Sequence, residues 1–287
     1  MTRRLRVALG LLWLLDGGLQ LQPFMLRSGF ARQVLDPAAA GQPHWVAGPV
    51  HWSANVVAAH PVAWDVPFAA VQLSIGLGLL IPRTAKVALV ASVPWALGVW
   101  FLGEALSGLA SGHASLLSGA PGSALLYAVL AVAAWPGGQA PPRWLPLVWA
   151  VLWVGAAVFQ ALPGQNTGGA VAGTLLRGDD GLDAWITRNG TAVVVALVVA
   201  EALIGLGALY RRSRNLAVAT GFVLALAIWV VAQDFGQLAS GQATDPNTAP
   251  LIALMALVLF RPQSRPVASR EQPRRRPEGR FAGCGRP

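Results

Sequence analysis

Long runs of apolar residues, separated by short polar stretches, dominate the chain. They cover approximately residues 5–22, 62–81, 86–106, 121–136, 145–162, 191–210, 215–235 and 249–260. A helix needs about 20 apolar residues to cross the hydrocarbon core of a bilayer, and most of these runs approach that length. The fourth and eighth runs are shorter, but each can extend backward into a weakly polar loop. The pattern predicts an all-α, polytopic transmembrane helical bundle with about eight spans.

Composition agrees with a membrane location. Of the 287 residues, 55% are hydrophobic and only 11% are charged, whereas about 25% of the residues of a soluble domain are charged. The high arginine, alanine and glycine content, with a single lysine at Lys86, is typical of a GC-rich bacterial genome. We therefore expect a bacterial plasma-membrane protein in contact with the lipid bilayer.

Basic residues between the apolar runs indicate an orientation. With eight spans, the basic residues before the first run and in every second loop fall on one side of the membrane: Arg3, Arg4, Arg6, Arg83, Lys86, Arg143, Arg211, Arg212 and Arg214. The short loops on the other side, after the third and seventh runs, contain no Lys or Arg. Cytoplasmic loops carry the excess of Lys and Arg, so both termini are predicted to be cytoplasmic.

Much of the net charge of +9 lies in the final segment, residues 263–287. This arginine- and proline-rich tail has few large apolar residues, so we expect a disordered cytoplasmic tail that is weakly attracted to anionic lipid. Phe281 is its only aromatic residue, which argues against nucleic-acid binding. The single cysteine, Cys284, also lies there and excludes an intrachain disulfide or a multi-thiolate metal site.

The two halves of the chain match in sequence. Residues 11–23 align with residues 151–163, and further along Ile75-Gly-Leu-Gly78 aligns with Ile204-Gly-Leu-Gly207 at an offset of 129 residues. The outer loops share the patterns LASGHAS and LASGQAT at the same offset. These matches predict a first four-helix repeat over residues 1–140 and a second over 141–262. Because each repeat has an even number of spans, both enter from the same side and the repeats are parallel.

The segment Gln72-Leu-Ser-Ile-Gly-Leu-Gly-Leu-Leu-Ile-Pro-Arg83 resembles the second and third helices of DoxX/DoxD-like membrane proteins, as does Glu201-Ala-Leu-Ile-Gly-Leu-Gly-Ala-Leu-Tyr-Arg-Arg212. The resemblance covers about residues 66–136 and 195–260. It implies a four-helix membrane bundle, and some members of the family are linked to quinone-coupled sulfur oxidation. This chain departs from the family in being doubled and in lacking cysteines within the membrane segments.

Polar residues inside the apolar runs are the first candidate functional group. They are Asp16, Gln20, Gln72, Gln160 and Glu201. Asp16 and Glu201 are expected near the bilayer centre with no cationic partner at that depth, so neutral carboxyls are the expected state. Gln20, four residues after Asp16, is its expected partner on the same helix face. These groups serve either as interhelical hydrogen bonds or as a proton-linked or quinone-headgroup site between the halves.

A second group is expected at the outer ends of the spans. Glu104 and Asp234 either face the membrane interface or form the rim of an outward-facing cavity, with Trp100 and Trp229 as its walls. The four histidines, His44, His51, His60 and His113, are also predicted to lie outside, near Met25. Imidazole suits copper or zinc, but the spacing fits no standard zinc pattern, and Gly48-Pro49 is expected to interrupt the helix joining the first two histidines. The accompanying tryptophans favour an interfacial aromatic belt.

Three functions follow from these patterns. The first is an accessory membrane component of a quinone-linked redox system, with redox-complex proteins as partners and without catalytic activity of its own. The second is a proton-coupled small-solute transporter, and the third is an extracytoplasmic metal-handling protein. No nucleophile motif or resident cofactor is evident in the sequence, and quinone is the candidate ligand.

Overall fold

The computed structural model describes residues 2–135, 141–174 and 180–260. The basic tail, with Phe281 and Cys284, lies outside the described residues. Within the described ranges the chain forms helices and turns and contains no β-strand.

Each of the eight apolar runs contains a helix. These helices are α1 (Thr2–Leu19), α5 (Pro61–Leu80), α6 (Ala85–Leu102), α7 (Ser123–Ala133), α8 (Leu145–Gln160), α11 (Gly190–Gly207), α12 (Arg214–Val231) and α13 (Thr248–Leu259). Among the described residues, α5, α6, α11 and α12 are long and apolar enough to cross a membrane. Helices α7, α8 and α13 are shorter, and α1 carries three arginines and an aspartate. The fold is that of an all-helical membrane protein.

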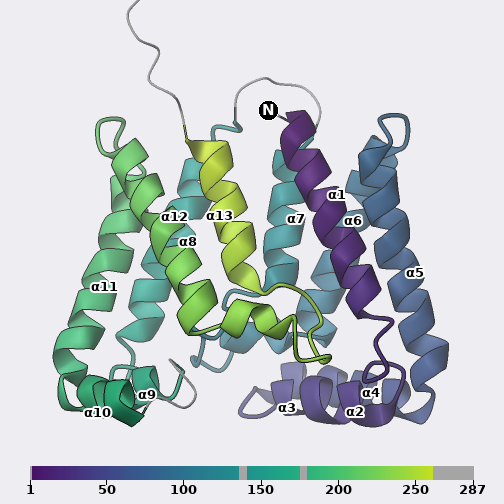
Figure 1. The fold of residues 1–287 in the computed structure, drawn as a ribbon, viewed down its shortest axis with the longest axis horizontal. Coiled ribbons are helices and arrows are strands. Elements are labelled where there is room, and N and C mark those ends of the chain that lie inside the picture. The colour runs from purple at the N-terminus through teal and green to yellow at the C-terminus, as the bar shows by residue number, and fades with distance from the viewer. Residues whose placement is uncertain (1, 136–140, 175–179, 261–287) are drawn as a thin grey trace, which may run out of the picture.

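The long helices stand side by side in two groups (Figure 1). One group contains α1, α5, α6 and α7, and the other contains α8, α11, α12 and α13, with α7 and α13 meeting at the centre. The N-terminal end of α1 and the α5–α6 and α11–α12 turns lie at the same end of the bundle (Figure 1). The basic residues of these segments therefore gather at one end.

Short helices lie across the opposite end (Figure 1). They are α2 (Ser28–Phe30), η1 (Ala31–Leu35), α3 (Asp36–Ala38), α4 (His44–Ala59), α9 (Gly168–Ala172) and α10 (Asp180–Arg188). The expected interruption at Gly48-Pro49 was wrong, because α4 continues through Pro49. A proline removes one backbone donor, but α4 continues on both sides of Pro49.

Small residues let α1 approach α5 and α8 approach α11 closely. A Cβ atom added at Gly76 would lie 2.9 Å from the Gly10 carbonyl oxygen, and one added at Gly205 would lie 3.0 Å from the Ala150 carbonyl oxygen. Such close backbone approach is typical of helix packing within membranes. The two contacts occupy matching positions in the two aligned halves.

The ends of α6 and α12 share an unusual geometry. Each is followed by a short 3₁₀ turn, η2 (Ala105–Gly108) or η3 (Asp234–Gln237), that contains left-handed residues. The Trp100 Nε1 donates to the Pro121 carbonyl at 2.7 Å, and the Trp229 Nε1 donates to the Pro246 carbonyl at 2.9 Å. These tryptophans therefore hold the loops that follow η2 and η3 to the helix ends.

Candidate ligand-binding cavity

A cavity of about 310 Å³ opens inside the first group of helices. Its lining comes from α1, η1, α4, α5, α6 and α7, and from a loop of the second half that contributes Thr244 and Asp245. Much of the wall is apolar or aromatic: Trp13, Phe30, Val34, Leu35, Val57, Phe68, Pro94, Trp95, Val99 and Leu102. The expected position between the halves was wrong in detail, because the first half forms most of the walls and the second half closes one side.

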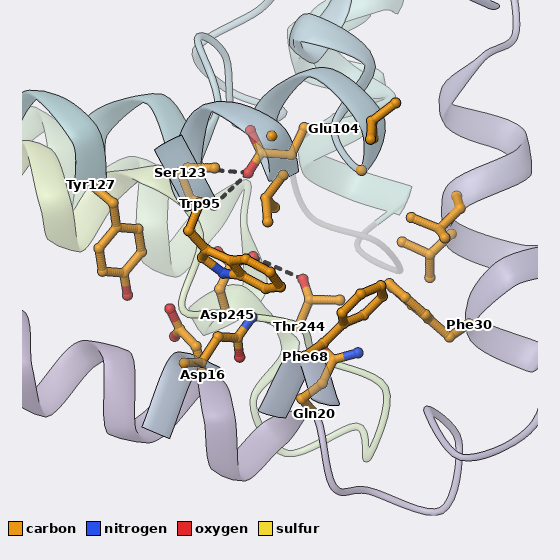
Figure 2. A pocket seen from close by; sticks show the side chains of 18 of the residues that line it. Asp16, Gln20, Phe30, Phe68, Trp95, Glu104, Ser123, Tyr127, Thr244 and Asp245 are labelled. Carbon is orange, nitrogen blue, oxygen red and sulfur yellow. Dashed lines mark hydrogen bonds between the residues drawn. The ribbon is translucent and has the colours of Figure 1, made fainter. Parts of the chain in front are cut away.

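Asp16 and Tyr127 bring polar chemistry to this cavity. Asp16 lies in the last turn of α1 and is 3% exposed, while Tyr127 on α7 is 2% exposed. The Tyr127 hydroxyl is turned toward the Asp16 carboxyl (Figure 2), and the Tyr127 ring packs on Trp13 with centroids 4.4 Å apart. Because α1 ends at Leu19, the Asp16 carboxyl lies near the C-terminal end of this helix. Its depth near the bilayer centre stays a prediction.

Several buried polar atoms on the cavity lining make no hydrogen bond to another protein group. They are Trp13 Nε1, Gln72 Oε1 and Trp95 Nε1. Asp16 Oδ1 and the Tyr127 hydroxyl interact with one another and have no closer hydrogen-bond partner in the protein. An unsatisfied buried donor or acceptor costs roughly 1–3 kcal/mol, so this grouping is a strong reason for the cavity to hold a molecule that bonds with them. The set contains both donors and acceptors.

Glu104 occupies the outer edge of the cavity, just beyond the end of α6. Its Oε1 accepts a hydrogen bond from the Ser123 hydroxyl at 2.6 Å and from the Ala124 backbone N–H at 3.0 Å (Figure 2). Burial, reinforced by the negative charge of Asp245, raises the pKa of Glu104 to about 7. Glu104 can therefore gain and lose a proton near neutral pH.

Asp245 is a cavity residue that sequence reasoning missed. Its Oδ1 accepts from the Asn247 backbone N–H at 2.7 Å and its Oδ2 accepts from the Thr244 hydroxyl at 2.8 Å (Figure 2). It belongs to the second half, more than 100 residues from the helices whose cavity it closes. Tyr127 was missed as well. The chain has only two tyrosines, and the polar hydroxyl of Tyr127 within an apolar run could have marked it as a candidate.

The partner expected for Gln20 was wrong. Gln20 Nε2 donates to Asp65 Oδ1 at 2.6 Å, across from α1 to the start of α5. Asp65 is completely buried. Because α1 ends at Leu19, the Gln20 side chain points toward α5 rather than back along α1. The Asp16 carboxyl is therefore not bonded to Gln20 and lines the cavity.

Glu201 and Gln160 lie in the second half, away from the cavity. Glu201 on α11 is 2% exposed, and its Oε2 makes no hydrogen bond. Gln160 Nε2 donates to the Gln165 carbonyl at 2.6 Å, and Gln165 Nε2 donates to the Gly112 carbonyl at 2.7 Å. Gln160 therefore supports a loop contact between the halves. Gln72, by contrast, does line the cavity, as the candidate group required.

The two halves differ at the outer rim. Asp234 was expected at the rim but is exposed, and its neighbour Gln233 takes the position that matches Glu104. Gln233 Nε2 donates to the Thr248 hydroxyl at 3.0 Å, and its Oε1 accepts from the Ala249 backbone N–H at 3.3 Å. Trp100 and Trp229 were expected as cavity walls, but the wall tryptophans are Trp13 and Trp95.

The histidines do not converge. His44, His51, His60 and His113 are all exposed. His51 Nδ1 lies 2.7 Å from Asp36 Oδ1, whereas Met25 is completely buried among apolar side chains. Among the described residues, no three His, Cys, Asp or Glu side chains are grouped as metal ligands.

No protein-family model, curated protein or solved structure matches the chain. The chemistry of the cavity is therefore the basis on which its function is argued.

Replacing Glu104 with glutamine should remove a pH-dependent loss of stability. The folded state holds the Glu104 proton up to about pH 7, whereas an unperturbed glutamate releases it near pH 4.5. The wild-type protein is then most stable at the acidic end and loses free energy of unfolding as the pH rises from about 4.5 to 7, on the order of 2 kcal/mol from this residue. Thermal unfolding in detergent from pH 4.5 to 8 measures the difference. Parallel pH curves for the two proteins would contradict it.

Proposed function

We propose that the chain crosses the plasma membrane eight times as two parallel four-helix repeats, with both termini in the cytoplasm. The eight helices follow the predicted apolar runs, and the basic residues of α1 and of the α5–α6 and α11–α12 turns collect at one end of the bundle. The short helices α7 and α13 are largely buried in the protein, where irregular backbone beside them is shielded from lipid.

Matching contacts support the duplication. The Gly76–Gly10 and Gly205–Ala150 approaches follow the two sequence offsets. The bonds from Trp100 to Pro121 and from Trp229 to Pro246 recur at the ends of α6 and α12. In this comparison Pro121 corresponds to Pro246, because the loop before α13 is four residues shorter than the loop before α7. The relation of this repeated unit to DoxX/DoxD-like membrane proteins is part of the same proposal.

The function proposed for this scaffold is binding of the ring of a quinone or quinol from the membrane, as an accessory component of a quinone-linked redox system. The observation that carries it is the set of unsatisfied donors and acceptors around one aromatic-lined cavity. A ligand pocket of this kind, mostly apolar with a few convergent polar groups, is the usual form of a small-molecule site.

The polar atoms suit both redox forms of such a ring. The carbonyl oxygens of a quinone accept hydrogen bonds from the indole N–H of Trp95 or Trp13 and from the Tyr127 hydroxyl. The hydroxyl groups of a quinol donate to Asp16 Oδ1 and Gln72 Oε1. Phe68 and Trp95, whose rings lie 5.7 Å apart in an edge-on arrangement, offer aromatic surface to the ring. Oxidation or reduction itself is left to a partner protein.

Proton-coupled solute transport is the second candidate. A second hollow, with many polar residues in its lining, adjoins the cavity and shares Glu104 and Asp245 with it. A solute and a proton would therefore have a common route. Uptake into vesicles that depends on a pH gradient and on Asp16, without saturable quinone binding, would favour this second function over the first.

Binding of a short-chain quinone to the purified protein tests the proposal. Tyr127→Phe and Trp95→Phe each remove one donor, and each should weaken binding about tenfold, the equivalent of one hydrogen bond in a buried site. Glu201→Gln is the matched control, because it neutralises a buried acid outside the cavity and should leave the affinity unchanged. Quenching of tryptophan fluorescence gives the affinities. Wild-type protein that shows no saturable binding would refute the quinone function.

A further inference from the structure

A second, larger hollow lies beside the ligand cavity. It has a volume of about 730 Å³ and is lined largely by loop residues of both halves, from the segments 104–123 and 232–247, together with residues 34–42. We call it the vestibule. Serine, glutamine, threonine and asparagine side chains are frequent in its lining, as are Glu104, His113 and Asp245. Its lining suits water, whereas the cavity behind it is largely apolar.

The vestibule and the cavity meet at a small set of shared residues. These are Val34, Glu104, Ser123, Thr244 and Asp245. Two of the five are acids, and they come from different halves of the chain. Asp16, with its side chain nearly fully buried, lies on the cavity side of this boundary together with Tyr127.

We infer that the vestibule is the aqueous route into the cavity and that Glu104 and Asp245 form its gate, which admits protons and small cations and disfavours anions. This inference rests on the proposed membrane placement and adds to the proposed ligand site a route and a side of the membrane. The side is that of the outer loops, opposite the N-terminal end of α1.

The hydrogen bonds hold the gate acids in place without neutralising them. Glu104 receives bonds from Ser107, Ser123 and the Ala124 backbone, while Asp245 receives bonds from Thr244 and the Asn247 backbone. None of these donors is a cation. Two acids at one constriction attract cations and repel anions, because the low-polarity walls of the cavity weaken the screening of their field.

The charged and titratable groups around the gate are Asp16 and Tyr127 on the cavity side and His113 among the vestibule residues. Asp245 and Asp16 influence one another and Glu104 electrostatically. The pKa of Glu104, about 7, lets the gate exchange protons at neutral pH.

Neither half carries both gate acids in its own sequence. In the second half, Gln233 aligns with Glu104. Its Nε2 donates to the Thr248 hydroxyl at 3.0 Å and to the Leu116 carbonyl at 3.2 Å. The position that matches Asp245 is Ala120, which is buried. The gate therefore needs one acid from each half, and it forms where the second-half loop that carries Asp245 closes the cavity of the first half.

A cysteine at position 98 tests the route. Gly98 lies in α6 on the cavity lining, and a Cβ atom added there meets nothing within 4 Å. Gly98→Cys is made in a Cys284→Ser background and labelled in vesicles with membrane-impermeant thiol reagents, one cationic and one anionic. We expect labelling from the loop side only, with the cationic reagent at least tenfold faster after correction for its reaction with a free thiol.

Neutralising the gate should remove the charge preference. With Glu104→Gln and Asp245→Asn added, the two reagents should react at nearly equal corrected rates, and the amide at Gln233 shows that such a residue fits this position. Gly155→Cys on α8, where a Cβ atom also meets nothing within 4 Å, should resist both reagents. Ser118→Cys in the vestibule should react from the loop side in every background.

Other results would overturn the inference. Labelling of position 98 only by membrane-permeant reagents would mean that the cavity opens to the lipid, and labelling from the N-terminal side would reverse the route. Equal rates for the two reagents in the protein with native Glu104 and Asp245 would leave a route without a gate. Quinone binding is measured separately. If the protein bound no quinone but was still labelled faster by the cationic reagent, the proposed ligand would be refuted and the proposed gate would not.

Discussion

Gly98→Leu is expected to weaken ligand binding at least 100-fold while the protein remains folded. Gly98 faces the cavity, and a Cβ atom added there meets no other atom within 4 Å. A leucine side chain would therefore extend into the space that the ligand ring needs, without displacing protein atoms. The lost contacts and the lost hydrogen bonds act together, and each 1.4 kcal/mol is a factor of ten in affinity.

Titration with a short-chain quinone measures this effect. Gly98→Ala fills only a small part of the space and should weaken binding much less. Gly155→Leu adds the same side chain to α8 in the second half, where there is also open space, and should leave binding unchanged. If Gly98→Leu binds as tightly as the wild-type protein, the ligand does not occupy this cavity.

Gly122→Ala is expected to lower the free energy of unfolding by roughly 3 kcal/mol or more, and to distort the gate. Gly122 has a φ of +108°, and its added Cβ would overlap Glu104 Oε2 and lie 2.5 Å from the Ser107 hydroxyl and 2.8 Å from Trp100 Cδ1. Both the backbone strain and the steric overlap oppose the substitution. The side chain that must move is the buried acid of the site.

A second glycine separates the two causes. Gly112 has a φ of +78°, but a Cβ added there meets nothing within 4 Å. Gly112→Ala therefore measures the strain alone, about 1–2 kcal/mol. Thermal unfolding in detergent compares the two variants, and equal losses of stability would show that the contact with Glu104 is unimportant.

Under the proposed repeat, the two halves of the chain differ at their centres. In the second half, Trp149 and Trp153 are fully buried with their rings 5.6 Å apart, and a Cβ atom added at Gly221 would overlap the Trp149 ring. In the alignment Trp149 replaces Leu9, and Ala156 replaces Asp16. The larger ring occupies interior space in one half, whereas smaller and polar side chains line a cavity in the other. The asymmetry places the proposed ligand chemistry in the first half.

The sequence by itself determined the helices and their order. Each apolar run is helical because a long apolar segment in a chain with so few charges must satisfy its own backbone hydrogen bonds. It also identified Asp16, Gln72 and Glu104, because polar groups at such positions are costly and need a partner or a purpose. The gathering of basic residues at one end could likewise be read from their spacing.

Tertiary structure alone decided which of these groups meet. Asp245 enters a cavity built by the other half, Gln20 bonds to Asp65 instead of Asp16, and Glu201 lies apart from the site. A period along one helix says which residues share a face, but it carries no information about which loop folds over that face. Neighbours more than 40 residues apart are set by how whole helices pack, and that packing makes Glu104 and Asp245 into one boundary between water and the cavity.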